Sequence, residues 1–147
     1  MSIHTDRRVR HASTLIELVL TMVMIGIVAA IAVPNLRTII DRMNVRAATQ
    51  DVVLGLWAAR NIATTRGEYA SFVVDSKAGR VRVISGGDTV FVRDIAGRRG
   101  VNVAVTRDSV TYAPTGIGYG AANTRIVLSR GKRSHTVTTS RLGRVSF

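Results

Sequence analysis

The chain has 147 residues, enough for one domain with a real hydrophobic core but too few for two ordinary domains. It carries 21 Lys and Arg residues against 9 Asp and Glu residues, and an excess of this size favours a polyanionic partner such as nucleic acid, anionic lipid or an acidic protein surface. The absence of cysteine excludes disulfides and thiolate sites, and it leaves the redox compartment open.

The first predicted element is a long apolar helix. Residues 18–36 contain no charged side chain, and this length is close to the ~20 residues that a helix needs to cross the hydrocarbon core of a membrane. Arg7, Arg8 and Arg10 precede the helix, with only Asp6 opposing them. Because a short basic head tends to stay in the cytoplasm, we expect a single span with the rest of the chain exported.

Hydropathy alone allows two interpretations of this span. One is an ordinary single-pass anchor. The other is a secretory signal, in which the small residues of Ala30-Ile31-Ala32 form a cleavage site and the released protein starts at Val33. Neither explains Glu17, because a carboxylate inside a membrane costs at least ~2.5 kcal/mol on insertion scales and needs a partner.

A third interpretation rests on residues 12–18, which read ASTLIEL and are followed by the apolar run and by Pro34. This string resembles the class III signal of type IV pilins and pseudopilins, where a prepilin peptidase cuts before the helix. Counted from Ser13 as the first mature residue, Glu17 is fifth and Pro34 is twenty-second, the positions that this family uses. The family usually has Gly before the cut and Phe after it, whereas this chain has Ala12 and Ser13. The resemblance makes Ala12 and Ser13 the processing site.

The resemblance also implies a role for Glu17. Cleavage after Ala12 leaves an amine on Ser13 that is usually N-methylated in this family and stays positive. Glu17 can face such an amine in its own helix or on a neighbouring subunit. An unpaired copy is penalised, so Glu17 sets the register of assembly rather than adding stability. The apolar residues 15–33 then form the filament core, and Pro34 is expected to bend or loosen the helix.

Residues 37–66 are predicted to continue the helix as its amphipathic second half, giving one helix of roughly 50 residues. Apolar residues recur here at intervals of three, four or seven. We expect this stripe to pack on the globular domain, with Trp57 and Ile62 beside it. Its members are Leu36, Ile40, Met43, Ala47, Leu54 and Ala58.

After Gly67 the hydrophobic period changes to two, which predicts short strands separated by turns. The expected fold class is therefore α+β: a long N-terminal membrane-spanning helix packed through its second half on an antiparallel β-sheet or small β-sandwich, as in pilins. The glycine-containing stretch 115–122 lacks the pattern of a nucleotide-binding loop and is expected to be a flexible loop. The predicted strands are 69–75, 80–84, 89–95, 101–106, 109–113, 125–129, 134–139 and 144–147.

Further cues resemble the GspH/FimT group of minor pseudopilins and pilins: the stretch LWAARNIA at 56–63, the all-β remainder and the ending Gly143-Arg144-Val145. The resemblance implies an inner-membrane protein with its C-terminal domain in the periplasm. Its partners would be a prepilin peptidase, other pseudopilins or pilins in a filament, and an inner-membrane assembly platform. The implied organisation is a leader at 1–12, a transmembrane and filament-core helix at 13–36, the amphipathic half-helix at 37–66 and a β-rich domain at 67–147.

A catalytic or metal site is not expected. His4 and His11 fall in the leader, which leaves His135 on a predicted strand. One histidine with scattered acids and no cysteine cannot supply a metal cluster or a dependable triad. We therefore expect no enzyme activity, no metal and no cofactor, and we expect His135 to face solvent.

Two functions remain open. The first is a minor pseudopilin of a type II secretion-type filament. The second is a minor type IV pilin that binds DNA during uptake, because no acidic residue follows Asp108 while basic residues continue to the end of the sequence. The basic tail could instead be solvated or dock to an acidic subunit, and residues 143–146 lack the second arginine of the Gly-Arg-x-Arg ending of some uptake relatives. The possible DNA-binding residues are Arg125, Arg130, Lys132, Arg133, Arg141 and Arg144.

Overall fold

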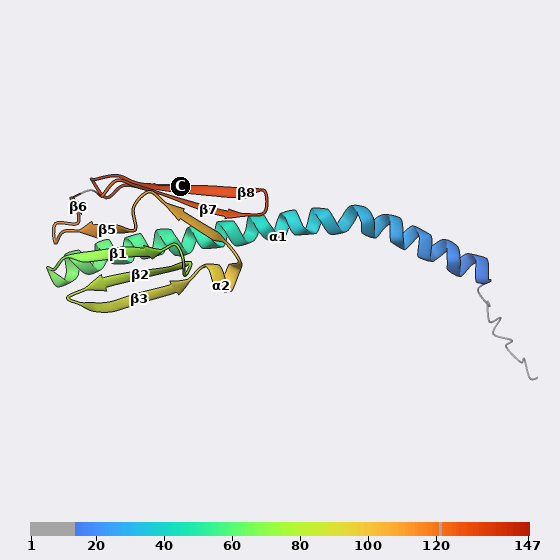
Figure 1. The fold of residues 1–147 in the computed structure, drawn as a ribbon, viewed down its shortest axis with the longest axis horizontal. Coiled ribbons are helices and arrows are strands. Elements are labelled where there is room, and N and C mark those ends of the chain that lie inside the picture. The colour runs from blue at the N-terminus through green and yellow to red at the C-terminus, as the bar shows by residue number, and fades with distance from the viewer. Residues whose placement is uncertain (1–13, 121) are drawn as a thin grey trace, which may run out of the picture. The chain divides into compact units, whose positions relative to one another are not determined.

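The computed structural model describes residues 14–120 and 122–147, so the predicted processing pair Ala12 and Ser13 lies outside the described residues. The chain divides into two compact units, Met1–Leu36 and Arg37–Phe147. One helix, α1 (Leu15–Arg66, 52 residues), contributes to both of them (Figure 1). Each unit is described by itself below.

The first unit is a single apolar helix in its described part. Thr14 precedes α1 and accepts a hydrogen bond at its Oγ1 from the backbone N–H of Glu17, at 3.4 Å between N and O. Every residue from 14 to 40 is exposed, and α1 is long and apolar enough to cross a membrane. The helix continues on both sides of Pro34, and the side chain of Asn35 donates to the carbonyl of Ile31. The bend expected at Pro34 stays a prediction.

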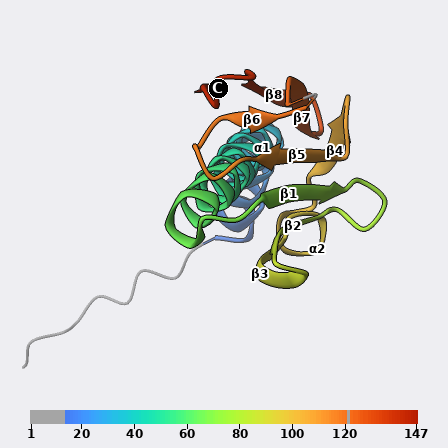
Figure 2. The same ribbon diagram turned by 90° about the vertical axis from the view of Figure 1, so that its left-hand side faces the viewer.

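The second unit contains the second half of α1 and two antiparallel sheets (Figure 2). The predicted α+β class is confirmed, and the strands form two sheets rather than one. The five-stranded sheet has the order β3-β2-β1-β5-β6, with β1 (Ala70–Asp75), β2 (Arg80–Ser85), β3 (Asp88–Asp94), β5 (Ser109–Tyr112) and β6 (Gly118–Tyr119). The four-stranded sheet has the order β4-β7-β8-β9, with β4 (Asn102–Val105), β7 (Thr124–Arg130), β8 (Arg133–Thr139) and β9 (Val145–Ser146).

Two local features differ from the expectation. A short helix, α2 (Ala96–Arg99), occupies part of the region predicted as a turn, and its Gly100 cap adopts a positive φ of 60°. Part of the stretch predicted as a flexible loop, 115–122, forms β6, whose residue Gly118 pairs with Tyr112 of β5. A Cβ at Gly118 would meet the Ala122 side chain at 2.4 Å, so this glycine permits close packing at the sheet edge.

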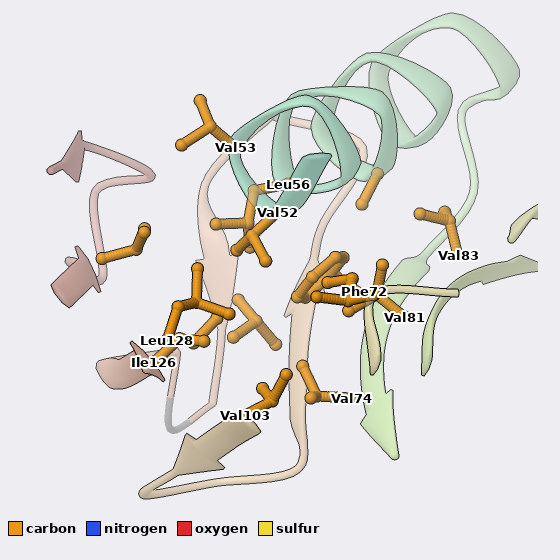
Figure 3. Packing of buried hydrophobic residues seen from close by; sticks show 14 of the residues in the cluster. Val52, Val53, Leu56, Phe72, Val74, Val81, Val83, Val103, Ile126 and Leu128 are labelled. Atoms are coloured by element: carbon orange, nitrogen blue, oxygen red, sulfur yellow. The ribbon is translucent and has the colours of Figure 1, made fainter. Parts of the chain in front are cut away.

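The face of α1 that packs on the sheets is not the predicted stripe. Met43 is 66% exposed, Leu54 55% and Trp57 61%, so the expectation that this stripe packs on the domain is wrong for its large residues. Ala47 and Ala58 are half-buried, and Ile62 beside the stripe does pack against the core, as expected. The buried face is built largely from small and β-branched residues, and it packs on Phe72, Ile126 and their neighbours (Figure 3). Its members are Val45, Ala48, Thr49, Val52, Val53, Gly55, Leu56, Ala59 and Ala63.

Close approach of the sheet explains why small residues mark the buried face. A Cβ on Gly55 would lie 2.6 Å from Cε2 of Phe72, a ring that is itself fully buried. Larger side chains at such positions would push the five-stranded sheet away from the helix. The large apolar residues Leu54 and Trp57 therefore lie on the side of the helix that the sheets leave uncovered.

Tyr112 is the largest fully buried side chain of the core. Burial raises the pKa of its hydroxyl above the ordinary value of 10.0, and the positive charge of Arg60 partly opposes this effect. The folded state consequently holds the tyrosine proton more tightly than the unfolded state does.

The assignment of the buried face predicts different costs for the same substitution at two neighbouring leucines. Leu56→Ala should lower the free energy of unfolding by about 2–5 kcal/mol, because it leaves a cavity in the core. Leu54→Ala should cost less than about 1 kcal/mol, because most of this side chain is already in contact with solvent. Urea unfolding of a fragment covering residues 37–147 measures both. Equal losses would contradict the assigned face.

The raised pKa of Tyr112 predicts that the free energy of unfolding falls at high pH. Its stabilising contribution is complete below pH 10 and is lost as pH rises through the raised folded-state pKa, because unfolding then releases the proton. Tyr112→Phe should flatten this alkaline fall in the free energy of unfolding. Tyr119→Phe, at an exposed position, serves as the control and should keep the wild-type fall. If the free energy of unfolding of Tyr112→Phe fell at high pH as much as that of the wild type, burial of the Tyr112 hydroxyl would not be the cause of the decrease.

Candidate functional site

The apolar part of α1 is the first candidate site. Large apolar side chains point away from this helix on all sides and are exposed, from Leu15 and Ile16 at its start to Ile31 and Val33 near Pro34. Soluble monomers rarely expose an apolar surface of such extent, so it marks a membrane or protein interface. Lipid, or apolar helices of other subunits, could cover the side chains of residues 14–36.

Glu17 is the one charged side chain on this part of the helix, counting residues 14–36. It lies in the first turn, three residues after Thr14, which is the spacing of a helix capping box. The free N–H groups at a helix start favour a carboxylate there. Glu17 thus occupies a position where helices commonly carry an acidic residue. The amine of Ser13, its proposed partner, lies outside the described residues.

One of the predicted DNA-binding residues has a structural role. Nε of Arg130 lies 2.8 Å from Oδ1 of Asp41, and the guanidinium also donates to the carbonyl of Arg99. Arg99 in turn pairs with Asp51, at 2.9 Å between Nη2 and Oδ2. These two ion pairs join α1 to β7 and to α2. Nothing in the linear pattern pairs these acids with these arginines, so the cluster could not be predicted from the sequence.

The remaining basic residues lie at the two ends of the β7–β8 hairpin. Lys132 and Arg133 are at the turn, where Arg130 is opposite Arg133. Arg125 is opposite Thr138 at the other end, near the segment that carries Arg141 and Arg144. Seven strand residues span about 20 Å, so the basic tail forms two separate groups. Arg125, Lys132, Arg141 and Arg144 are exposed, and Arg133 is half-buried.

His135 lies on β8 and is exposed, which confirms the expectation for this residue. It is opposite Leu128, a core residue, so its side chain points to the sheet face that packs on α1. There it lines a hollow between β8 and α1 together with Arg133. No group of three or more His, Cys, Asp or Glu side chains that could hold a metal occurs among residues 14–120 and 122–147.

A long N-terminal helix whose second half packs on antiparallel sheets is the fold of the pilin-like proteins. The structure is similar to the crystal structure of the type IV minor pilin FimU of Pseudomonas aeruginosa, with a TM-score of 0.60 and 13% sequence identity over 71% of this chain and 88% of that one. It is also similar to the minor pseudopilin EpsH from the type 2 secretion system of Vibrio cholerae, with a TM-score of 0.55 and 10% identity over 70% of this chain and 94% of that one.

At these identities the likeness shows the fold alone. No protein-family model matches the sequence, and no curated protein matches it. The fold fits both a minor pilin and a minor pseudopilin.

Proposed function

We propose that this protein is a minor pseudopilin, a structural rather than catalytic subunit of a periplasmic filament of the type II secretion type. The observation that carries the proposal is the exposed apolar half of α1, with Glu17 in its first turn, attached to a pilin-like domain. Such a helix first anchors the subunit in the inner membrane. It then leaves the lipid for a filament core, where helices of other subunits cover the same side chains.

Processing precedes assembly in this proposal. A prepilin peptidase cuts between Ala12 and Ser13, the new amine is methylated, and an inner-membrane platform adds the subunit to a filament of other pseudopilins or pilins. The positive amine and Glu17 then neutralise each other in an apolar environment, where either charge alone would be costly. The neighbouring structures support this proposal through their fold, since their names include both a minor pilin and a minor pseudopilin.

The role of Glu17 can be separated from that of the helix cap. Glu17→Ala should still insert in the membrane and be processed, but it should lose incorporation into filaments because the pairing charge is gone. Glu17→Gln keeps the size of the side chain and should fail in the same way. Immunoblots of sheared filaments and of membranes from cells that carry the partner subunits measure both steps.

A matched variant tests the alternative that Glu17 only starts the helix. Thr14→Val removes the Oγ1 acceptor and should reduce incorporation much less than Glu17→Gln does. Normal incorporation of Glu17→Gln into filaments would contradict the proposed pairing of Glu17 with the terminal amine. Equal defects in both variants would assign Glu17 to helix capping.

A second function, DNA binding by a minor type IV pilin during uptake, is favoured by one observation. Arg125, Arg141 and Arg144 are exposed, lie near one end of the β7–β8 hairpin and make no ion pair among the described residues. Three guanidinium groups in one region could neutralise phosphates.

Salt dependence tests this second function. The double change of Arg141 and Arg144 to Gln should weaken duplex binding similarly for different sequences and reduce the slope of log affinity against log salt by up to ~2 contacts, at about 0.9 per contact. Arg80 and Arg98, exposed residues on β2 and α2, provide the matched control pair. Equal losses from both pairs would indicate general charge attraction and leave the secretion role as the better proposal.

A further inference from the structure

A hollow of about 510 Å³ lies between α1 and the start of β8, entirely within the second unit. Its helix side comes from residues one and two turns apart, and its strand side comes from the first three residues of β8. The lining residues are Arg42, Val45, Arg46, Thr49, Gln50, Arg133, Ser134, His135 and Phe147.

Positively charged side chains line this hollow. Arg42, Arg46 and Arg133 are among the lining residues, and no Asp or Glu side chain is. None of the three arginines makes an ion pair within the described parts of the chain. The nearest acid in the sequence, Asp41, already pairs with Arg130. Arginines that line one hollow without an acidic side chain favour a carboxylate or phosphate group from a partner, since planar bidentate pairs are strong.

The backbone at the same place is also unpaired. β9 pairs with β8 only at Thr138 and Thr139, so in the described chain residues 133–136 have a partner strand, β7, on one side only. Arg133 and His135 point to one face of the sheet and Ser134 to the other, yet all three line the hollow. The hollow therefore opens along the free edge of β8. Free strand edges of this kind receive an added strand from another chain.

We propose that this hollow, the β8 groove, binds an extended acidic segment of a partner protein. The segment adds to the free edge of β8 as a further strand and directs its alternate carboxylates to Arg42, Arg46 and Arg133. The methylene groups that carry these carboxylates contact Val45 and Phe147, the apolar part of the lining. A backbone edge and an apolar wall suit a peptide better than a phosphate, which needs neither. The proposal goes beyond the filament role and does not depend on how the N-terminus is processed.

The probe is a synthetic peptide with the sequence Thr-Glu-Thr-Glu-Val-Glu-Thr, blocked at both ends, and the protein is the full chain in detergent micelles. Isothermal titration should give saturable binding. Arg42→Gln and Arg46→Gln should each weaken it about tenfold, as expected for the loss of one charge-assisted hydrogen bond. Both residues are exposed, so the variants should fold normally. Arg80→Gln, at an exposed position on β2, is the matched control and should bind like the wild type.

Two further peptides separate strand addition from simple charge attraction. The peptide with Gln in place of every Glu should lose binding, and so should the acidic peptide with alternate backbone nitrogens methylated, because these nitrogens can no longer donate to β8. Hydrogen exchange should show that the acidic peptide protects outward-facing amides of residues 133–136.

Equal weakening by Arg80→Gln, or full binding of the methylated peptide, would overturn the proposal. Binding of dihexanoylphosphatidylglycerol or of duplex DNA that competes with the peptide at the same arginines and is tighter would also overturn it, in favour of a phosphate ligand. None of these outcomes changes the test of Glu17, so failure here is distinguishable from failure of the filament role.

Discussion

The apolar side chains of the first half of α1 have nothing within the described chain to pack against, and the functional account depends on this constraint. Residues 14–40 are all exposed, although most of them are apolar. Burying such a surface is worth on the order of tens of kcal/mol, far more than the net stability of a small domain. Lipid can supply this environment first and neighbouring helices later. A carboxylate such as Glu17 is costly in that environment without a partner, which is why we propose that it sets how subunits pair.

The second unit is built so that it does not need the first for its core. Its buried residues all fall between Val45 and Gly143, and the helix contributes small and β-branched side chains on which both sheets can pack closely. Two ion pairs, Asp41–Arg130 and Asp51–Arg99, fix the helix to β7 and α2 at partly exposed positions. Such pairs add little stability but define one arrangement. The unit therefore presents a fixed surface whose uncovered parts, the Trp57 side of α1 and the β8 groove, are available to partners.

Much of this architecture could be predicted from the sequence, because the helical and strand periods are local properties. The helix and most of the strands followed from period and turn residues. The covered face of α1 could not be predicted in the same way: Leu54 and Leu56 are equally apolar, and only the approach of Phe72 to Gly55 decides which face is buried. The basic tail looked continuous, yet the hairpin separates it into two groups. Arg42 and Arg133 line one groove although they are 91 positions apart in the sequence, and no linear pattern predicts this.

The central claim is that α1 serves assembly after its leader has been removed, and the N-terminus of the mature chain tests this claim most directly. Intact mass and N-terminal sequencing would be carried out on the full chain extracted from membranes of cells that contain a prepilin peptidase. The account predicts a protein that starts at Ser13 and carries a methyl group on its terminal amine. A protein that starts at Val33 would show a secretory signal instead. An uncleaved chain would show a plain anchor, and either result would contradict the account.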